Sequence, residues 1–282
     1  MSSWLMPDWE KTVVFIGQEI LMSDKTVENQ IGTGAIIQYN GIFYIVTCKH
    51  VIFEQKDNVR ENVFVAFNSK TGGVVKRKLK DIEKVFKIRW FIHKDPRVDL
   101  VVIPFGFDIQ NDDIATIPEN VFLPYGEIET ADDIFLLGYQ PGLPYKKMKP
   151  IVRSGIISRV EGDNILYIDA SVFPGNSGSP VLLRPSPIQL DKKNKSFNIG
   201  GAIHSGRLIG ICSGYIPYEE IAISLQTGKP RIIFEENTGL SQVWSTDLIK
   251  EIFSQDEIKA EIERFSKENP EGKVVLENAT ST

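Results

Sequence analysis

The 282-residue chain contains only two cysteines, Cys48 and Cys212. Two cysteines exclude a scaffold held by many disulfides, and we expect two free buried thiols rather than a single bridge. No stretch reaches the ~18 consecutive apolar residues of a membrane-spanning helix. The first ten residues also lack the basic leader and apolar run of a secretory signal. These absences predict a cytoplasmic protein with no membrane partner.

The chain also lacks an excess of positive charge: it has 32 Lys and Arg and 37 Asp and Glu, which gives a net charge of −5. Broad neutralisation of phosphates requires a basic surplus, so we expect no nucleic-acid partner. Hydrophobic residues (42%) and charged residues (24%) are present in the proportions of an ordinary folded protein. This composition excludes a disordered or fibrous chain.

Short apolar runs separated by Gly, Pro and Asn recur from about residue 11 to 105 and again from 133 to 212. Asn40-Gly41 splits two of these runs, which predicts a β-hairpin because both residues tolerate positive φ. Runs with this spacing are typical of a sandwich or barrel. The loop-like stretch 110–125 marks the junction of two β units, and 184–198 is expected to be a solvated insertion.

The apolar period changes near the C-terminal end, where Leu248, Ile249, Ile252 and Phe253 are spaced as one face of a helix. A Ser254–Glu257 capping box predicts the start of a second helix, and Pro270 ends the pattern. We expect these apolar faces to pack on the β units.

The strongest chemical signal is the turn-like segment 173–181, in which two glycines flank Ser177. A nucleophilic serine requires an exposed hydroxyl and unobstructed backbone N–H groups nearby. The same composition also occurs in ordinary turns. A serine hydroxyl is a weak nucleophile without a base, so a histidine has to lie close to it.

The chain has three histidines, and His50 is the best candidate for the base because it ends a strongly apolar strand. His93 and His204 lie in polar or Gly-rich segments and are expected to be exposed loop residues. A histidine base needs an anion to hold its tautomer. Asp99 opens another apolar run, where a carboxylate is costly unless it is paired. Asp95, before a proline, suits a turn better.

Four segments in this order resemble the trypsin-like serine peptidases, most closely their bacterial Deg/high-temperature-requirement branch. They are Gly32-Thr-Gly-Ala-Ile-Ile37, Ile45-Val-Thr-Cys-Lys-His50, Val98-Asp-Leu-Val-Val-Ile103 and Pro174-Gly-Asn-Ser-Gly-Ser-Pro180. The likeness extends from about residue 11 to 253. It implies an all-β fold of two six-stranded antiparallel β-barrels (chymotrypsin-like), with the active site in the cleft between them and C-terminal helices. The remaining tail is too short for the PDZ module of many relatives.

The resemblance also implies the roles of individual residues. His50 corresponds to the general base, Asp99 to its orienting partner and Ser177 to the nucleophile, with the amides of Gly175 and Ser177 as the oxyanion hole. The positions that correspond to substrate-binding residues are Ser171, Cys212, Ser213, Gly214, Tyr215 and Gln242. Asn176 stands where zymogen-activated relatives carry Asp, so we expect no activation of that type.

The resulting prediction is a serine endopeptidase that acts on a protein or peptide and needs no cofactor or metal. We expect one barrel over residues 11–110, a second over 125–246, a helical segment over 247–269 and a disordered tail over 270–282. A regulatory or peptide-binding module with little turnover is the alternative. An α/β-hydrolase is close to excluded, because it needs the serine before the histidine. The sequence leaves the oligomeric state open.

Overall fold

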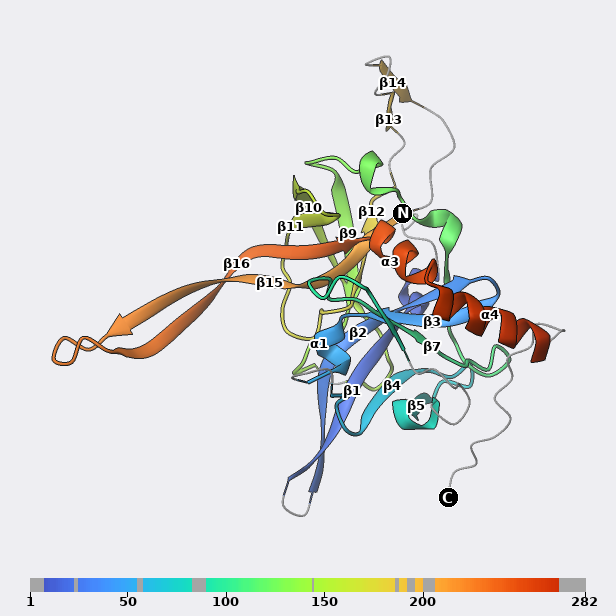
Figure 1. Ribbon diagram of the computed structural model, residues 1–282, viewed down its shortest axis with the longest axis horizontal. Coiled ribbons are helices and arrows are strands. Elements are labelled where there is room, and N and C mark those ends of the chain that lie inside the picture. The colour runs from blue at the N-terminus through green and yellow to red at the C-terminus, as the bar shows by residue number, and fades with distance from the viewer. Residues whose placement is uncertain are drawn as a thin grey trace.

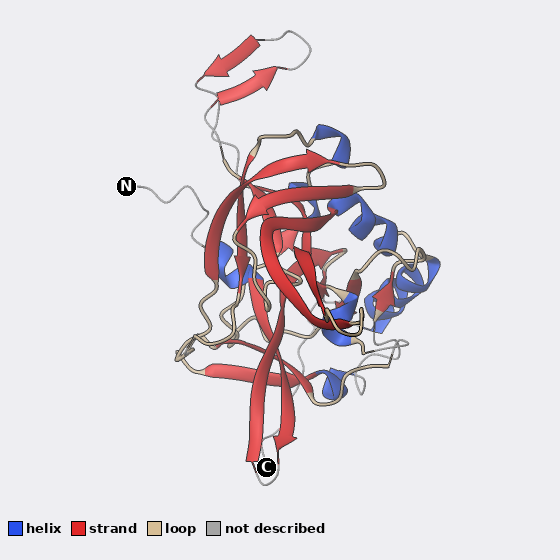
Figure 2. Cartoon of the chain, turned by 90° about the vertical axis from the view of Figure 1, so that its left-hand side faces the viewer, coloured by secondary structure: helices blue, strands red, loops and turns tan. Residues whose placement is uncertain are grey.

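The computed structural model describes residues 8–22, 25–54, 58–82, 90–143, 145–185, 188–191, 196–199 and 206–268. Strands dominate these residues and form two large sheets, with helices at the surface (Figures 1 and 2). The predicted all-β class in two β units is confirmed. The predicted tail 270–282 and His204 lie outside the described residues.

The first sheet holds eight strands: β1 (Val13–Met22), β2 (Lys25–Tyr39), β3 (Ile42–Thr47), β4 (Val63–Asn68), β5 (Val74–Lys78), β6 (Phe91–Ile92), β7 (Val101–Pro104) and β8 (Ile117–Pro118). Their order is β5-β4-β1-β2-β3-β7-β6, with β8 parallel to β2. Asn40 and Gly41 have φ of 46° and 79°, as the predicted tight hairpin requires. Six strands were expected in this unit, and the two additional ones are the two-residue segments β6 and β8. The segment predicted as a loop contributes β8 because buried Ile117 pairs with Ile37.

The second sheet is a closed six-stranded barrel, as expected. It comprises β9 (Asp133–Gly138), β10 (Ile151–Val160), β11 (Ile165–Ala170), β12 (Pro180–Leu183), β15 (Arg207–Ile223) and β16 (Pro230–Ser245), in the order β10-β11-β16-β15-β12-β9. Alternate residues of these strands point inward and form a separate apolar core, including Leu136, Ile157, Ile168 and Val243, none of which is exposed.

Two parts of this unit differ from the prediction. The run expected over 208–212 continues to Ile223, and its partner β16 is of similar length, so that a two-stranded arm projects from the barrel (Figure 1). The segment predicted as a solvated insertion contains a small sheet of β13 (Ile188–Asp191) and β14 (Ser196–Ile199), for which the sequence had given no strand prediction. Only the first half of β15 contributes side chains to the barrel core. The spacing of core residues in the sequence therefore did not predict the arm.

Helical segments are short in the first unit, with α1 (Lys49–Ile52), α2 (Leu79–Ile82) and 3-10 helices at 9–12, 119–121 and 125–127. At the C-terminal end, α3 (Thr246–Phe253) and α4 (Asp256–Glu268) fold back onto the first sheet. Phe253 stacks on Tyr39 with ring centroids 4.2 Å apart, so the predicted apolar face is buried there. Ser254 closes α3 and donates to the Glu251 carbonyl instead of forming the predicted capping box. None of the described helices has the length and apolarity required to cross a bilayer.

Candidate active site

Ser177 lies in a double turn between β11 and β12. Backbone hydrogen bonds of 3.0 Å join the first and fourth residues of two successive turns, 173–176 and 176–179. Gly175 (φ 91°) and Gly178 (φ 88°) occupy the third position of each turn. A positive φ at this position is typical of a type II turn and strongly favours glycine. The double turn leaves Ser177 partly exposed at its centre.

The backbone N–H groups of Gly175 and Ser177 have no hydrogen-bond acceptor among the described residues. The carbonyl of Gly175 is held from the other side, because Thr33 Oγ1 donates to it at 2.8 Å and Gln30 Nε2 at 3.3 Å. Buried N–H groups without a protein acceptor are rare. These two N–H groups are therefore available to an oxygen atom brought by a ligand.

Asn176 anchors the double turn from within the protein. Its side chain is fully buried, Oδ1 accepts the N–H of Phe173 at 3.1 Å, and Nδ2 donates to the Tyr139 carbonyl at 2.8 Å. The sequence reasoning treated Asn176 only as a departure from relatives, and it missed Thr33 and Gln30. Thr33 was within a motif that carried the resemblance, whereas nothing in the sequence distinguished Gln30.

His50 and Asp99 are brought together at the ends of the neighbouring strands β3 and β7 in the first sheet. The Asp99 Oδ2 atom lies 2.6 Å from His50 Nδ1, and Oδ1 accepts the His50 backbone N–H at 3.0 Å. Ser213 Oγ from β15 donates to Oδ2 at 2.9 Å. His50 lies in the one-turn helix α1 rather than at the strand end, because β3 stops at Thr47 and Asp99 accepts the backbone N–H groups of Lys49 and His50 at the start of the new turn.

The environment of Asp99 favours its charged form. Burial alone raises the pKa of this carboxyl, but the His50 ring and amide and the Ser213 hydroxyl outweigh burial and hold the pKa below its ordinary value. A carboxylate at this position keeps the proton of the imidazole on Nδ1 and leaves Nε2 free to accept another.

Ser177 reaches the same place from the barrel. The Thr33 N–H of the first sheet donates to the Ser177 carbonyl at 2.8 Å. A Cβ atom built on Gly214, the residue after Ser213, would lie 3.9 Å from Ser177 Oγ. The serine hydroxyl therefore lies close to β15, the strand whose Ser213 donates to Asp99. The described residues include no hydrogen bond between the His50 ring and Ser177 Oγ.

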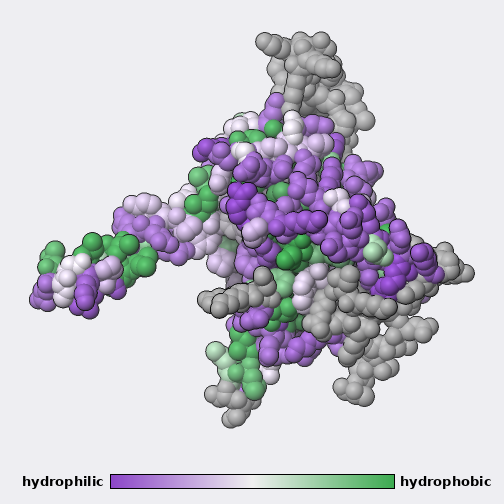
Figure 3. All heavy atoms as spheres, viewed as in Figure 1, coloured by the Kyte–Doolittle hydropathy of each residue, from purple (hydrophilic) through white to green (hydrophobic). Residues whose placement is uncertain are grey.

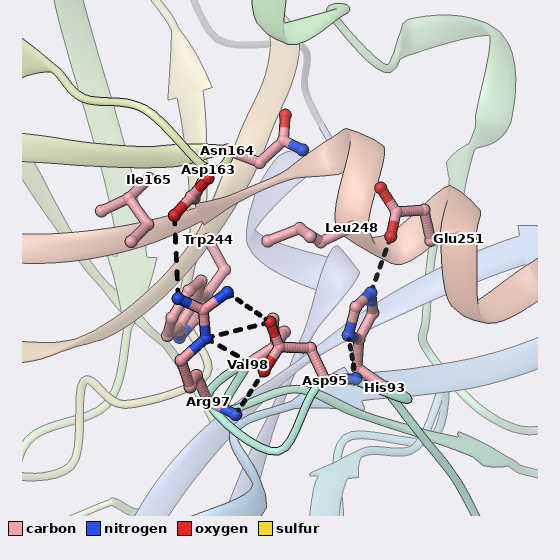
Figure 4. Close-up of a pocket in the computed structure, with 10 residues that line it drawn as sticks. All are labelled: His93, Asp95, Arg97, Val98, Asp163, Asn164, Ile165, Trp244, Leu248 and Glu251. Carbon is pink, nitrogen blue, oxygen red and sulfur yellow. Dashed lines mark hydrogen bonds and ion pairs between the residues drawn. The ribbon is translucent and has the colours of Figure 1, made fainter.

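The other described histidine, His93, is not the exposed loop residue that we expected. It is only 9% exposed, and its Nε2 lies 2.8 Å from Glu251 Oε2 on α3. Figure 4 shows both residues in the wall of a separate cavity of about 220 Å³, where Asp95 binds Arg97 through several hydrogen bonds. His93 and Asp95 therefore already have partners of their own, apart from the His50–Asp99 pair.

Cys48, His50 and Asp99 place one thiol, one imidazole and one carboxylate atom within 4.8 Å of one another. Burial, followed by the nearby Asp99 charge, raises the pKa of the Cys48 thiol well above its ordinary value. Its Sγ instead donates to the Cys212 carbonyl. Metal ions bind the thiolate, so these three groups fit a metal poorly. Both cysteines are free, as expected.

For the peptidase activity expected from the sequence, 5 mM EDTA, an excess on the order of 10³ over enzyme, should leave the rate of peptide hydrolysis unchanged within twofold. The measurement compares initial rates before and after dialysis against the chelator. Loss of activity that zinc restores would mean that a metal takes part.

The six predicted substrate-binding positions lie in the barrel on either side of the double turn. Ser171 is exposed before the turn, and Gly214 pairs with Gln242 in the β15–β16 ladder. Cys212 is fully buried, and burial raises the pKa of its thiol to about 12. The Tyr215 hydroxyl donates to Glu235 at the base of the arm. Five of these positions therefore lie on the paired strands β15 and β16, and Ser171 lies just before the double turn.

The chain is similar to known peptidases. A family model described as a trypsin-like peptidase domain matches residues 32–185, more than half of the chain. Similar solved structures include an HtrA-type protease, AlgW, with a decapeptide, and the serine endoprotease from Yersinia pestis. The first is 18% identical with a TM-score of 0.45 and covers 84% of this chain and 61% of its own. The second is 20% identical with a TM-score of 0.47 and covers 90% of this chain and 64% of its own.

This chain thus spans less than two thirds of the length of either of these two structures. No curated protein is similar enough to match. The family match includes the segments that carry His50, Asp99 and Ser177, and its upper bound lies just after β12. The chain therefore belongs to the family of trypsin-like peptidase domains.

Proposed function

We propose that this protein is a serine endopeptidase that hydrolyses peptide bonds through an acyl-enzyme formed on Ser177. The observation that carries the proposal is the 2.6 Å contact between Asp99 and His50, made beside a serine whose turn offers two unengaged N–H groups. Membership of a peptidase family supports the same reaction.

In the proposed reaction, Ser177 Oγ attacks the carbonyl carbon of the scissile peptide bond while His50 Nε2 takes the hydroxyl proton. Asp99 stabilises the imidazolium that forms. The negative oxygen of the tetrahedral intermediate accepts hydrogen bonds from the N–H groups of Gly175 and Ser177. The C–N bond then breaks, and His50 returns its proton to the leaving amine.

The second half of the reaction restores the serine. A water molecule gives a proton to His50 Nε2 and attacks the Ser177 ester, which again produces an oxyanion at the same N–H pair. Collapse of this intermediate breaks the ester bond, returns the proton to Ser177 and releases a carboxylic acid. No cofactor or metal takes part in the proposed cycle.

One observation favours a second candidate, a regulatory or peptide-binding module with little turnover. The His50 ring and Ser177 Oγ are not hydrogen-bonded in this structure, so the serine is not yet activated as the mechanism requires. Catalytic hydrogen bonds are often long or misaligned before substrate binds, and they tighten in the complex. We therefore retain the peptidase as the principal proposal.

A fluorophosphonate probe distinguishes the two candidates, because it reacts with a serine only when the base and oxyanion hole are assembled. We expect labelling of Ser177, located by mass spectrometry, together with cleavage of casein or of a peptide library. The Ser177→Ala protein is the negative control. Absence of both labelling and cleavage in the folded wild-type protein would reject the peptidase in favour of the binding module.

We also propose that the enzyme prefers small or medium uncharged residues, such as Ala, Val, Ser or Thr, before the scissile bond. By the family pattern, Ser171 lies at the pocket base and carries no charge to attract Lys or Arg. Tyr215 and Gln242 take wall positions at which wide pockets have glycine. Their side chains narrow the slot against Phe and Tyr.

Cleavage of a randomised peptide library measures this preference directly. Tyr215→Ala should raise kcat/KM for Phe relative to Ala substrates by about 10-fold, because it removes a wall side chain. Tyr218→Ala, three residues along the same strand but out on the exposed arm, is the matched control and should leave the profile unchanged. Dominant cleavage after Lys, Arg, Phe or Tyr by the wild type would mean that the pocket is assigned wrongly.

A further inference from the structure

The arm formed by the outer halves of β15 and β16 carries the most conspicuous apolar surface of the described residues (Figures 1 and 3). Six large apolar side chains near its end are each more than half exposed: Ile221, Ile223, Leu225, Ile232, Ile233 and Phe234. We call this set the arm tip. Ile221 pairs directly with Ile233, and Phe234 lies opposite Glu220, so the apolar side chains occupy both faces of the ribbon.

The arm tip presents a large apolar area for the surface of a monomer. Half-exposed side chains of this size each present about 100 Å², so the tip offers on the order of 600 Å² of apolar surface. Patches of this extent reach the upper limit for monomeric proteins, and they mark sites of interaction. A standard interface buries about 800 Å² on each partner, which the tip and its polar margins together can supply.

Acidic residues border the arm tip on the side toward the barrel, and basic residues lie at its outer end. Glu219, Glu220, Glu235 and Glu236 lie on the side toward the barrel. Lys229 and Arg231 lie at the outer end, beyond the Ile221–Ile233 pair. None of these six side chains forms an ion pair with any other described residue. The arm therefore has an acidic base and an apolar outer part, and the far end of the apolar part also carries the cations Lys229 and Arg231.

We propose that the arm is a self-association surface that binds the arm of a second copy of this chain. An antiparallel arrangement about a two-fold axis places the basic end of each arm against the acidic base of the other. The apolar segments then cover one another in the middle. Such an interface is self-complementary, as two-fold symmetry requires.

The geometry of the isolated arm supports this occupant. A two-stranded ribbon without further packing is marginally stable in water, whereas four strands bury one another. Each arm also offers free backbone edges along β15 and β16, which a second ribbon can cover. Glu219 and Glu235 face each other directly across the ladder, an arrangement that repels unless cations approach. The partner's basic end supplies those cations.

The first test measures molar mass by sedimentation velocity from 1 to 100 μM, a range chosen to span about two decades of dissociation constant. We expect a dimer, and we expect Ile233→Ser to raise its dissociation constant at least 10-fold. Ile109→Ser removes a similarly exposed isoleucine from a loop outside the arm and should have no effect. A monomeric wild type, or a dimer that Ile233→Ser does not weaken, would overturn the proposal.

The second test separates a lost interface from a damaged fold. One variant combines Lys229→Glu with Arg231→Glu, and the other replaces all four glutamates of the acidic base, Glu219, Glu220, Glu235 and Glu236, with lysine. In either variant alone, the outer end of one arm would meet a base of the same charge, so each variant should be monomeric. An equimolar mixture should form a heterodimer, because each outer end then meets a base of opposite charge. Circular dichroism checks that both variants are folded.

Failure of the mixture of folded variants to associate would exclude the antiparallel arrangement. If the wild type were monomeric and its arm bound anionic phospholipid vesicles instead, a lipid surface would replace the second copy as occupant. The proposal does not depend on peptidase activity, since both tests measure mass alone.

Discussion

Replacing Ser177 with alanine is expected to lower kcat/KM for a cleaved peptide by about 10⁴–10⁶-fold, the range found when a triad nucleophile is removed. The variant has no oxygen to attack the carbonyl carbon, while the backbone N–H groups at positions 175 and 177 and the substrate contacts remain. Residual catalysis of about 10³–10⁴ over the uncatalysed reaction is therefore expected. The measurement is a progress curve on the best peptide from the library, with active-site titration of the wild type.

The same variant should keep its fold. The Ser177 hydroxyl makes no hydrogen bond with the described residues, so its removal leaves no partner unsatisfied. The free energy of unfolding, measured by thermal denaturation, should change by no more than about 0.5 kcal/mol. Ser179→Ala is the matched control two residues away, because its buried hydroxyl also lacks a hydrogen-bond partner among the residues that the structure describes. Ser179→Ala should keep its activity, and retention of more than a tenth of the activity by Ser177→Ala would remove Ser177 from its role.

Replacing Asp99 with asparagine is expected to lower kcat by about 10⁴-fold with little change in KM, the loss typical of such triads. The carboxylate accepts from His50 Nδ1 and thereby holds the tautomer whose Nε2 is free. An amide N–H₂ at this position donates to Nδ1 instead, so that Nε2 carries the proton and cannot take one from Ser177. The loss should therefore fall on the chemical step, which single-turnover kinetics isolates.

Asp95→Asn is the control for this substitution. Asp95 lies four residues earlier and carries a carboxylate that binds Arg97 at the surface, where ion pairs contribute little to stability. Its replacement should leave kcat unchanged within about twofold. Equal losses in the two variants, or a loss confined to KM in Asp99→Asn, would contradict the orienting role of Asp99.

The sequence predicted the local features of the site because short segments determine them. Asn40-Gly41 predicted a hairpin, and the glycines at 175 and 178 lie in a segment predicted as a turn; the structure contains both features. The arrangement in two β units also followed from the spacing of apolar runs. In each case, neighbouring residues along the chain impose the backbone conformation.

Contacts between distant segments could not be predicted in this way. Gln30 holds a carbonyl 145 residues away, and His93 meets Glu251 across 158 residues. The same polar residue types occur in exposed loops, so His93 was wrongly expected to be exposed. Only the packing of α3 against the first sheet shows that His93 already has a partner.

The sequence by itself therefore determined the family, the two β units and the candidate residues His50, Asp99 and Ser177, because motifs and periodicity are properties of neighbouring residues. The tertiary structure alone decided how His50 and Asp99 meet, which buried groups anchor the double turn and how far β15 and β16 extend beyond the barrel. Those features depend on strand register and on sheet packing, through which residues far apart in the chain come within hydrogen-bonding distance.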